Sequence, residues 1–125
     1  MRLLLDTHAL LWWLDDNPTL SRKARLAISN PRNAVFVSAV SVWEIVLKKK
    51  AGKLRAPEDL ESELGRHHFQ ALPVTIAHAQ ALEKLPDHHA DPFDRMLIAQ
   101  AQSESLSLVT RDAHIRKYQV NIIEA

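Results

Sequence analysis

Four acidic residues stand at positions where a parallel sheet would bring them together. Asp6 follows residues 2–5, an apolar run typical of a buried strand, and Asp112 follows a second such run. Open parallel sheets bind their ligands outside the carboxyl ends of the strands, near the point where the strand order reverses. We therefore expect Asp6 and Asp112 at one edge of one sheet, with Glu44 and Asp94 brought to it by helices.

Glu44 and Asp94 are both expected to point inward from their helices. Val40 and Leu47 flank Glu44 at helical spacing, and Ile98 lies one turn after Asp94. Carboxylates that face a core need partners, because an unpaired buried charge is costly. Several acids aimed at one place also repel each other. A hard divalent cation relieves both problems, and an all-oxygen donor set suits Mg²⁺ or Mn²⁺ better than zinc.

Such a cluster fits the hydrolysis of a phosphodiester. Two oxygen-ligated ions roughly 3.5–4 Å apart activate a water and stabilise the departing alkoxide. Each acid also has an ordinary explanation. Asp6 and Asp112 can cap the helices that follow them, and Asp94 can complement a helix dipole. Glu44 can pair with Lys48 one turn later. The joint placement of all four favours the metal interpretation.

Length and composition predict one globular domain. The chain has 125 residues, which suits a single core spanning residues 1–125, and 46% of them are hydrophobic. The absence of cysteine excludes disulfides and thiolate metal sites. No apolar run reaches membrane-spanning length, and no signal peptide is recognised at the N-terminus. We therefore expect no membrane association and a cytoplasmic location.

Basic residues gather in three groups although the net charge is only +1. These are Arg22, Lys23 and Arg25; then Lys48, Lys49, Lys50, Lys53 and Arg55; then Arg111, Arg116 and Lys117. If a metal site sequesters several acids, the remaining surface is positive, and a polyanion is a reasonable partner. The run from Lys48 to Lys50 also suits a helix C-terminus, where cations are favoured.

Strands and helices are expected to alternate along the chain. Strands are predicted at residues 2–5, 34–37, 72–74, 106–109 and 120–123. Helices are predicted at residues 7–15, from Thr19 or Ser21 to 28, from Ser38 or Ser41 to 50, and at 57–65, 76–85 and 113–118; a further strong helix opens at Asp91-Pro92. This alternation predicts an α/β fold, a parallel sheet covered by helices on both faces.

Four segments along the chain form a recognisable series. They are Leu5-Asp6-Thr7-His8, residues 41–45, Asp91-Pro92-Phe93-Asp94-Arg95 with its continuation to Ala99, and residues 108–112. This series, which covers essentially the whole chain in the expected order, resembles the PIN domain, and the likeness is closest to the VapC-type toxins of toxin–antitoxin pairs. The resemblance implies an α/β/α sandwich, Mg²⁺- or Mn²⁺-dependent cleavage of RNA and a small antitoxin partner.

The resemblance also implies roles for individual residues. Its acidic quartet falls on Asp6, Glu44, Asp94 and Asp112. Thr110 matches a position that often supports the site, and Thr7 is a weaker candidate. Asp91 is a candidate outer ligand, although its role as a helix cap explains it equally well.

Three basic residues near these acids are candidates for contact with RNA. Arg95 and Arg111 adjoin proposed ligands, where they would meet phosphate or balance the acids, and Lys48 is the third candidate. His88 and His89 look like part of a small metal cluster, but no further His or Cys completes a zinc site. For these histidines we favour a polar surface loop.

Aromatic and apolar residues indicate where a partner would bind. Trp13 and Trp43 are expected in core or interface packing, and Trp12 is expected to be exposed. The helices around Trp12, Leu26 and Leu54 would supply the apolar part of an antitoxin interface. A homodimer is left open.

The sequence leaves three functions open. The first is an endoribonuclease toxin restrained by an antitoxin, and the second is a related nuclease that acts on DNA or in RNA processing without one. The third is a receiver-type or metal-binding module that cleaves nothing. A receiver needs a lysine near its last strands, and Arg111-Asp112 offers none, so the third is the least favoured.

Overall fold

A computed structural model describes residues 1–125 and contains one five-stranded sheet. All pairings are parallel, in the order β3-β2-β1-β4-β5. The strands are β1 (Arg2–Leu5), β2 (Ala34–Ser38), β3 (Gln70–Leu72), β4 (Ser107–Thr110) and β5 (Ile122–Glu124). Because β1 lies at the centre with β2 on one side and β4 on the other, the strand order reverses between β1 and β4.

Six α-helices and two short 3₁₀ turns connect the strands. They are α1 (Thr7–Leu14), α2 (Arg22–Ser29), α3 (Ala39–Lys50), α4 (Leu60–Arg66), α5 (Ile76–Ala81), η1 (Leu82–Lys84), α6 (Pro92–Glu104) and η2 (Ile115–Lys117). Each α-helix begins after a residue whose side chain accepts a hydrogen bond from the first turn, which satisfies one of the otherwise unpaired N–H groups. These caps are Asp6, Ser21, Ser38, Asp59, Thr75 and Asp91.

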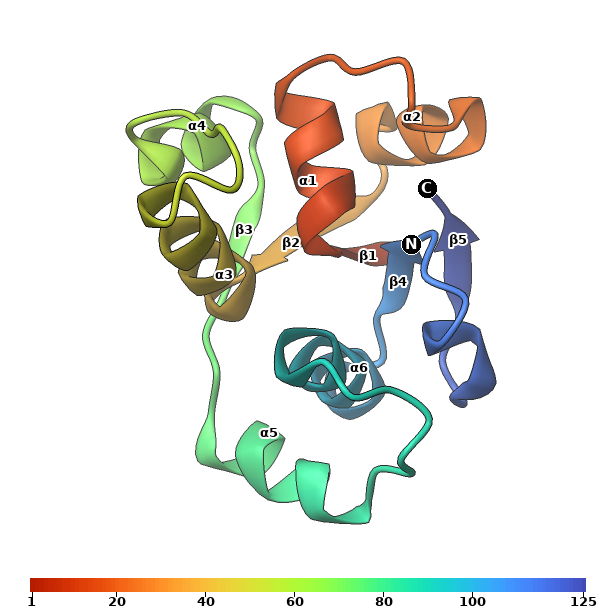
Figure 1. Ribbon diagram of the computed structural model, residues 1–125. Coiled ribbons are helices and arrows are strands. Elements are labelled where there is room, and N and C mark those ends of the chain that lie inside the picture. The colour runs from red at the N-terminus through yellow and green to blue at the C-terminus, as the bar shows by residue number, and fades with distance from the viewer.

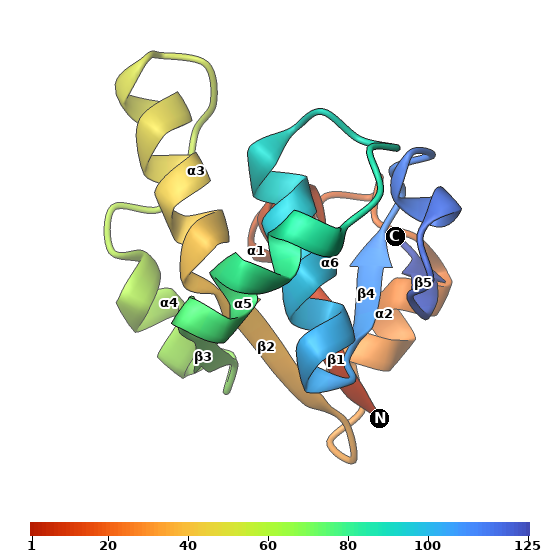
Figure 2. The same ribbon diagram turned by 90° about the horizontal axis from the view of Figure 1, so that it is seen from below.

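The helices cover both faces of the sheet, as predicted for an α/β/α sandwich (Figures 1 and 2). Side chains alternate along β1, so Leu3 and Leu5 pack with α1, α2 and α4, whereas Leu4 packs with α6 on the other face. All three leucines are fully buried. No helix is long and apolar enough to cross a membrane.

Several element boundaries differ from the predicted ones. β3 covers residues 70–72 rather than 72–74, since Pro73 has no N–H to continue the ladder. β5 begins at Ile122 rather than at residue 120. α4 begins after Asp59, which caps it, so residues 57–59 precede the helix. The predicted helix at 76–85 divides into α5 and η1, and the one at 113–118 is only the single turn η2.

The tryptophans divide between packing and exposure. Trp13 is half-buried, and its indole N–H donates to Nδ1 of His67 at 3.2 Å. Trp12 is half-buried rather than exposed, because the guanidinium of Arg111 lies 4.7 Å from the centre of its ring. Trp43 is 59% exposed on α3 and so lies outside the core, and it touches the ring of Phe93 edge-on; its place in an interface stays a prediction.

Candidate active site

The reversal of strand order places the first and last acids of the quartet together. Asp6 directly follows β1, and its N–H donates to the carbonyl of Val109 in β4 at 3.0 Å. Asp112 lies two residues beyond the end of β4. The carboxyl ends of the two central strands therefore carry both aspartates, at the edge of the sheet where parallel α/β folds bind ligands.

Asp6 is a buried helix cap. Its Oδ1 accepts the N–H of Ala9 at 2.8 Å, and the residue is only 6% exposed. Burial raises the pKa of Asp6 above its ordinary value, although a hydrogen bond from the side chain of Thr110 acts in the opposite direction. The capping role expected from sequence is thus confirmed, but it leaves the carboxylate short of positive partners.

Asp112 also caps a turn but is better supplied with donors. Its Oδ1 accepts the N–H groups of His114 at 2.7 Å and Ile115 at 3.3 Å. Its Oδ2 lies 3.0 Å from Nε2 of His89. Burial acts to raise the pKa of Asp112, but the bonds from His89 and the two backbone groups outweigh it and hold the pKa below its ordinary value.

Asp94 reaches the same place from the first turn of α6. Its Oδ2 lies 3.1 Å from Nε2 of His89, and 22% of its side chain is exposed. Desolvation by burial, together with the negative charges of Asp91 and Asp6, raises the pKa of Asp94 to about 7. A carboxyl with such a pKa lies in a field of negative charge that a cation would neutralise.

Three of the four acids line one pocket. This cavity has a volume of about 290 Å³ and is lined by Asp6, His8, Trp12, Asp94, Arg111 and Asp112. On its loop side, His89, Asp94 and Asp112 offer ligand atoms that all lie within 4.8 Å of one another. The donors are mostly carboxylate oxygens, and the raised pKa values of Asp6 and Asp94 show that their charge is under-compensated. The residues present therefore fit a hard divalent cation.

Glu44 is not among the residues that line this pocket, and its carboxylate has two side-chain partners. It is 4% exposed on α3, and its Oε1 accepts the hydroxyl hydrogen of Thr7 at 2.6 Å. Its Oε2 lies 2.5 Å from Nζ of Lys48, the pairing one turn apart that the sequence allowed. This bond raises the pKa of Lys48, and the nearby charges of Asp91 and Asp94 act in the same direction.

Thr110 and Asp91 organise the backbone around the acids. Thr110 is fully buried, and its hydroxyl oxygen accepts the N–H of Asp112 at 3.1 Å. Asp91 caps α6 by accepting the N–H groups of Phe93 and Asp94 through Oδ1. Both residues thus position the acids through the main chain.

The two arginines near the acids are engaged with backbone carbonyls. Arg95 donates to the carbonyls of Leu85, Pro86 and His89 and so holds the loop before α6. Arg111 donates to the carbonyls of Thr19 and Ala125. These contacts give both residues a structural role, and their contact with RNA stays a prediction.

The sequence interpretation was wrong for His89. A polar surface loop was favoured, but its side chain is only 10% exposed and Nε2 faces two of the acids. Its neighbour His88 is exposed and packs edge-on against the ring of Tyr118. The spacing of the two histidines gave no signal of this difference, which depends on how the loop folds over the end of β4.

The family is decided by comparison with known proteins. The family model described as the PIN domain matches residues 3–121. This chain belongs to the PIN-domain family. In sequence it is similar to Ribonuclease VapC22 of Mycobacterium tuberculosis (strain ATCC 25618 / H37Rv), with 28% identity over 118 residues, 92% of this chain and 90% of that protein.

Solved structures share this PIN fold over nearly their whole length. The structure of VapBC2 from Rickettsia felis, bound to a DNA fragment from its promoter, matches with a TM-score of 0.72 at 16% identity, covering 98% of both chains. A toxin–antitoxin complex from Klebsiella pneumoniae matches with a TM-score of 0.64 at 21% identity, covering 98% of this chain and 96% of that one. At such identities the likeness establishes the fold alone.

Proposed function

We propose that this PIN domain is a divalent-metal-dependent endoribonuclease and the toxin of a toxin–antitoxin pair. The observation that carries the proposal is the meeting of Asp6, Asp94 and Asp112 in one pocket at the strand ends. The similarity to a protein named as a ribonuclease, and to a toxin–antitoxin complex of the same fold, supports it.

Asp6, Asp94 and Asp112 hold Mg²⁺ or Mn²⁺ in this proposal, and Glu44 is the fourth acid. A bound ion supplies activation of a water and stabilisation of the departing alkoxide. The chain supplies the rest. The hydroxyl oxygen of Thr110 accepts the N–H of Asp112 and so orients that residue. The hydroxyl of Thr7 donates to Oε1 of Glu44 at 2.6 Å and holds its side chain in place. Asp91 aligns the first turn of α6, which carries Asp94.

Lys48, Arg95 and Arg111 are the proposed contacts to RNA phosphate. Lys48 has 38% of its side chain exposed beside Glu44, and Arg111 is also exposed. Arg95 and Arg111 would have to share their N–H groups between backbone carbonyls and substrate. The proposal that RNA binds here depends on these three positive side chains near the acids.

The antitoxin is proposed to cover the acids and the neighbouring apolar surface. A groove of about 500 Å³ lies between α1 and the segment before α4, lined by Leu11, Trp12, Leu14, Asp15, Arg55, Ala56 and Pro57. Leu26 on α2 is 59% exposed. An Arg or Lys of the antitoxin inserted among the acids would replace the metal charge. A homodimer and a cytoplasmic location stay predictions.

The metal proposal is tested by an RNA cleavage assay with purified protein. We expect cleavage with Mg²⁺ or Mn²⁺ and none after EDTA is added in excess. Asp6→Ala is the matched control and should be inactive with either metal. Full activity in EDTA would refute the metal requirement.

The toxin proposal is tested by expression with and without the neighbouring gene. We expect growth arrest that Asp6→Ala relieves and that the neighbour's product also relieves. Harmless expression of an intact, metal-active enzyme would favour a nuclease in RNA or DNA processing that has no antitoxin.

A further inference from the structure

His89 lies between two carboxylates of the candidate site. Its Nε2 is 3.1 Å from Oδ2 of Asp94 and 3.0 Å from Oδ2 of Asp112. The same two oxygens are among those that the proposed metal site requires. The imidazole therefore either joins them in binding a cation or competes with the cation for them, and these two roles need opposite protonation of Nε2.

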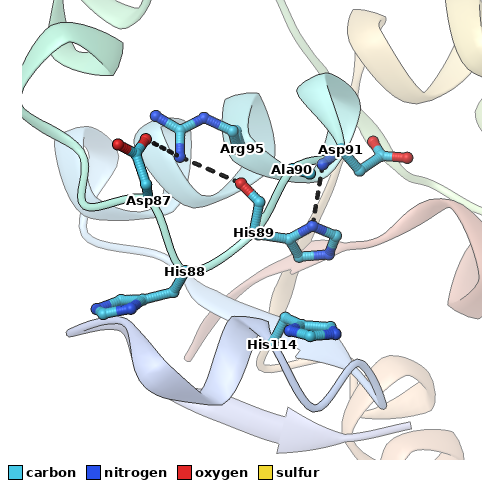
Figure 3. A pocket seen from close by; sticks show the side chains of 7 residues that line it. All are labelled: Asp87, His88, His89, Ala90, Asp91, Arg95 and His114. Atoms are coloured by element: carbon cyan, nitrogen blue, oxygen red, sulfur yellow. Dashed lines mark hydrogen bonds and ion pairs between the residues drawn. The ribbon is translucent and has the colours of Figure 1, made fainter.

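The other ring nitrogen decides between the two roles. Nδ1 of His89 accepts the backbone N–H of Asp91 at 3.1 Å (Figure 3). Because Nδ1 acts as an acceptor, the single ring hydrogen of the neutral imidazole is on Nε2. His89 thus presents an N–H donor to Asp112, with Asp94 beside it, rather than a lone pair to a metal.

This arrangement is the reverse of a metal-bound histidine. A ligating histidine coordinates through an unprotonated nitrogen, and its other ring N–H donates to a carboxylate, carbonyl or water. To coordinate through Nε2, His89 would have to move its hydrogen to Nδ1. The Nδ1–H would then face the N–H of Asp91, and both donors would lose their acceptors.

The loop that carries His89 is anchored, but its side chain has room to move. The hydroxyl oxygen of Tyr118 accepts the N–H groups of His88 and His89, each at 2.9 Å. Arg95 donates to the carbonyl of His89 at 3.3 Å. An open pocket of about 890 Å³ adjoins the imidazole and is lined by Asp87, His88, His89, Ala90, Asp91, Arg95 and His114 (Figure 3). The ring can therefore rotate away from the acids while the backbone stays in place.

We propose that His89 is a positioning residue that competes with the divalent cation. Its Nε2–H donates to Asp112 and lies against Asp94, and the cation binds the two carboxylates when the imidazole turns into the adjoining pocket. This inference rests on the proposed metal-dependent function, which it deepens by assigning a residue that sets metal affinity without binding metal.

The first test measures Mn²⁺ binding by isothermal titration calorimetry with full-length protein and no RNA. His89→Ala should bind Mn²⁺ about tenfold more tightly than the wild type, because a hydrogen bond to charged groups no longer has to be broken. In EDTA the same variant should melt at a lower temperature. His88→Ala is the control from the same loop and should bind Mn²⁺ as the wild type does.

A second test uses the wild-type protein and does not depend on a variant that folds. Two-bond ¹H–¹⁵N spectra of the histidine rings report which nitrogen carries the hydrogen. We expect His89 to remain in the Nε2–H form both in EDTA and with saturating Mg²⁺, and its ring signals to shift as the ring leaves the carboxylates. Conversion to the Nδ1–H form on adding Mg²⁺ would assign His89 as a ligand and overturn the proposal.

The outcomes separate this inference from the proposed function. Weaker or unchanged Mn²⁺ binding by His89→Ala, with His88→Ala normal, overturns the role of His89 and leaves the metal site intact. Absence of Mn²⁺ binding by the wild type overturns the proposed function, and the inference with it. His89→Gln, which keeps an N–H at a similar reach, should bind Mn²⁺ less tightly than His89→Ala.

Discussion

The ends of β1 and β4 carry aspartates with the same local role and opposite electrostatics. Asp6 and Asp112 each cap the helical turn that follows a central strand. Asp6 is buried, and its pKa is raised, whereas 30% of the Asp112 side chain is exposed and its pKa is lowered. The two residues are neighbours in one pocket, so the difference arises from the deeper burial of Asp6 and from the donors that Asp112 receives.

The comparison indicates which side of the site needs a cation. Asp112 receives a ring N–H from His89 and two backbone N–H groups, which compensate its charge. Asp6 has a backbone donor and a threonine hydroxyl, but burial outweighs them. The carboxylates that lack sufficient positive partners are therefore those of Asp6 and Asp94. The pKa of Asp94 is raised to about 7.

The largest expected effect is loss of cleavage when either aspartate becomes asparagine. Asp6→Asn and Asp112→Asn should each reduce RNA cleavage by roughly a thousandfold, since each removes a proposed metal ligand. Asparagine is a good helix cap, so both variants should stay folded. Initial rates of cleavage in Mg²⁺ measure this effect, and near-normal rates in either variant would remove that residue from the proposed site.

The same two variants should move stability in opposite directions. In EDTA at pH 7, Asp6→Asn should raise the free energy of unfolding, because it removes a charge that burial disfavours. Asp112→Asn should lower it by about 1 kcal/mol, because it weakens charge-assisted hydrogen bonds. Denaturant unfolding measures both, and a shift of the same sign in both variants would contradict the comparison.

Melting temperatures measured over a range of pH should test the raised pKa of Asp94. A carboxyl whose pKa is higher in the folded than in the unfolded protein binds its proton more tightly when folded, so stability falls as pH rises between the two values. For Asp94 that window runs from the ordinary 3.8 to about 7. Melting temperatures in EDTA should therefore fall less steeply over this range in Asp94→Asn than in the wild type.

The smallest expected effect is the loss of stability when Glu44 loses its ion pair with Lys48. Lys48→Met removes the ion pair to Glu44 but keeps the bond from Thr7, and Lys48 is partly exposed. Because Lys48 is partly exposed but the Glu44 that it would leave unpaired is buried, the expected loss in the free energy of unfolding is about 1 kcal/mol. A loss several times larger in a denaturant titration would mean that Lys48 is the main compensation for the buried Glu44.

The sequence predicted the sandwich and the placement of Asp6 and Asp112 after strands because both follow from local patterns. Apolar runs that end in Asp6 or precede Asp112 identify strand ends, and Asp91-Pro92 identifies the start of α6. Strand limits were less accurate, since β3 is set by its pairing with β2 and by Pro73 rather than by hydrophobicity. The predicted PIN resemblance was confirmed by the match to residues 3–121.

What the sequence could not predict depends on contacts between distant segments. The orientation of His89 follows from Tyr118 and Arg95, which hold its loop across the end of β4. The engagement of Arg111 with Thr19 and Ala125 likewise requires the packed chain. Roles of individual residues in catalysis stay predictions until the variants above are measured.

The order of the strands also determines when the site can exist during synthesis. β1 is made well before its partner β4 and the residue Asp112. Pairing between segments so far apart in sequence forms late in folding. A growing or truncated chain that stops before Asp112 contains Asp6 without its neighbour across the pocket. The ribosome that makes this protein therefore carries an incomplete site until Asp112 has been added.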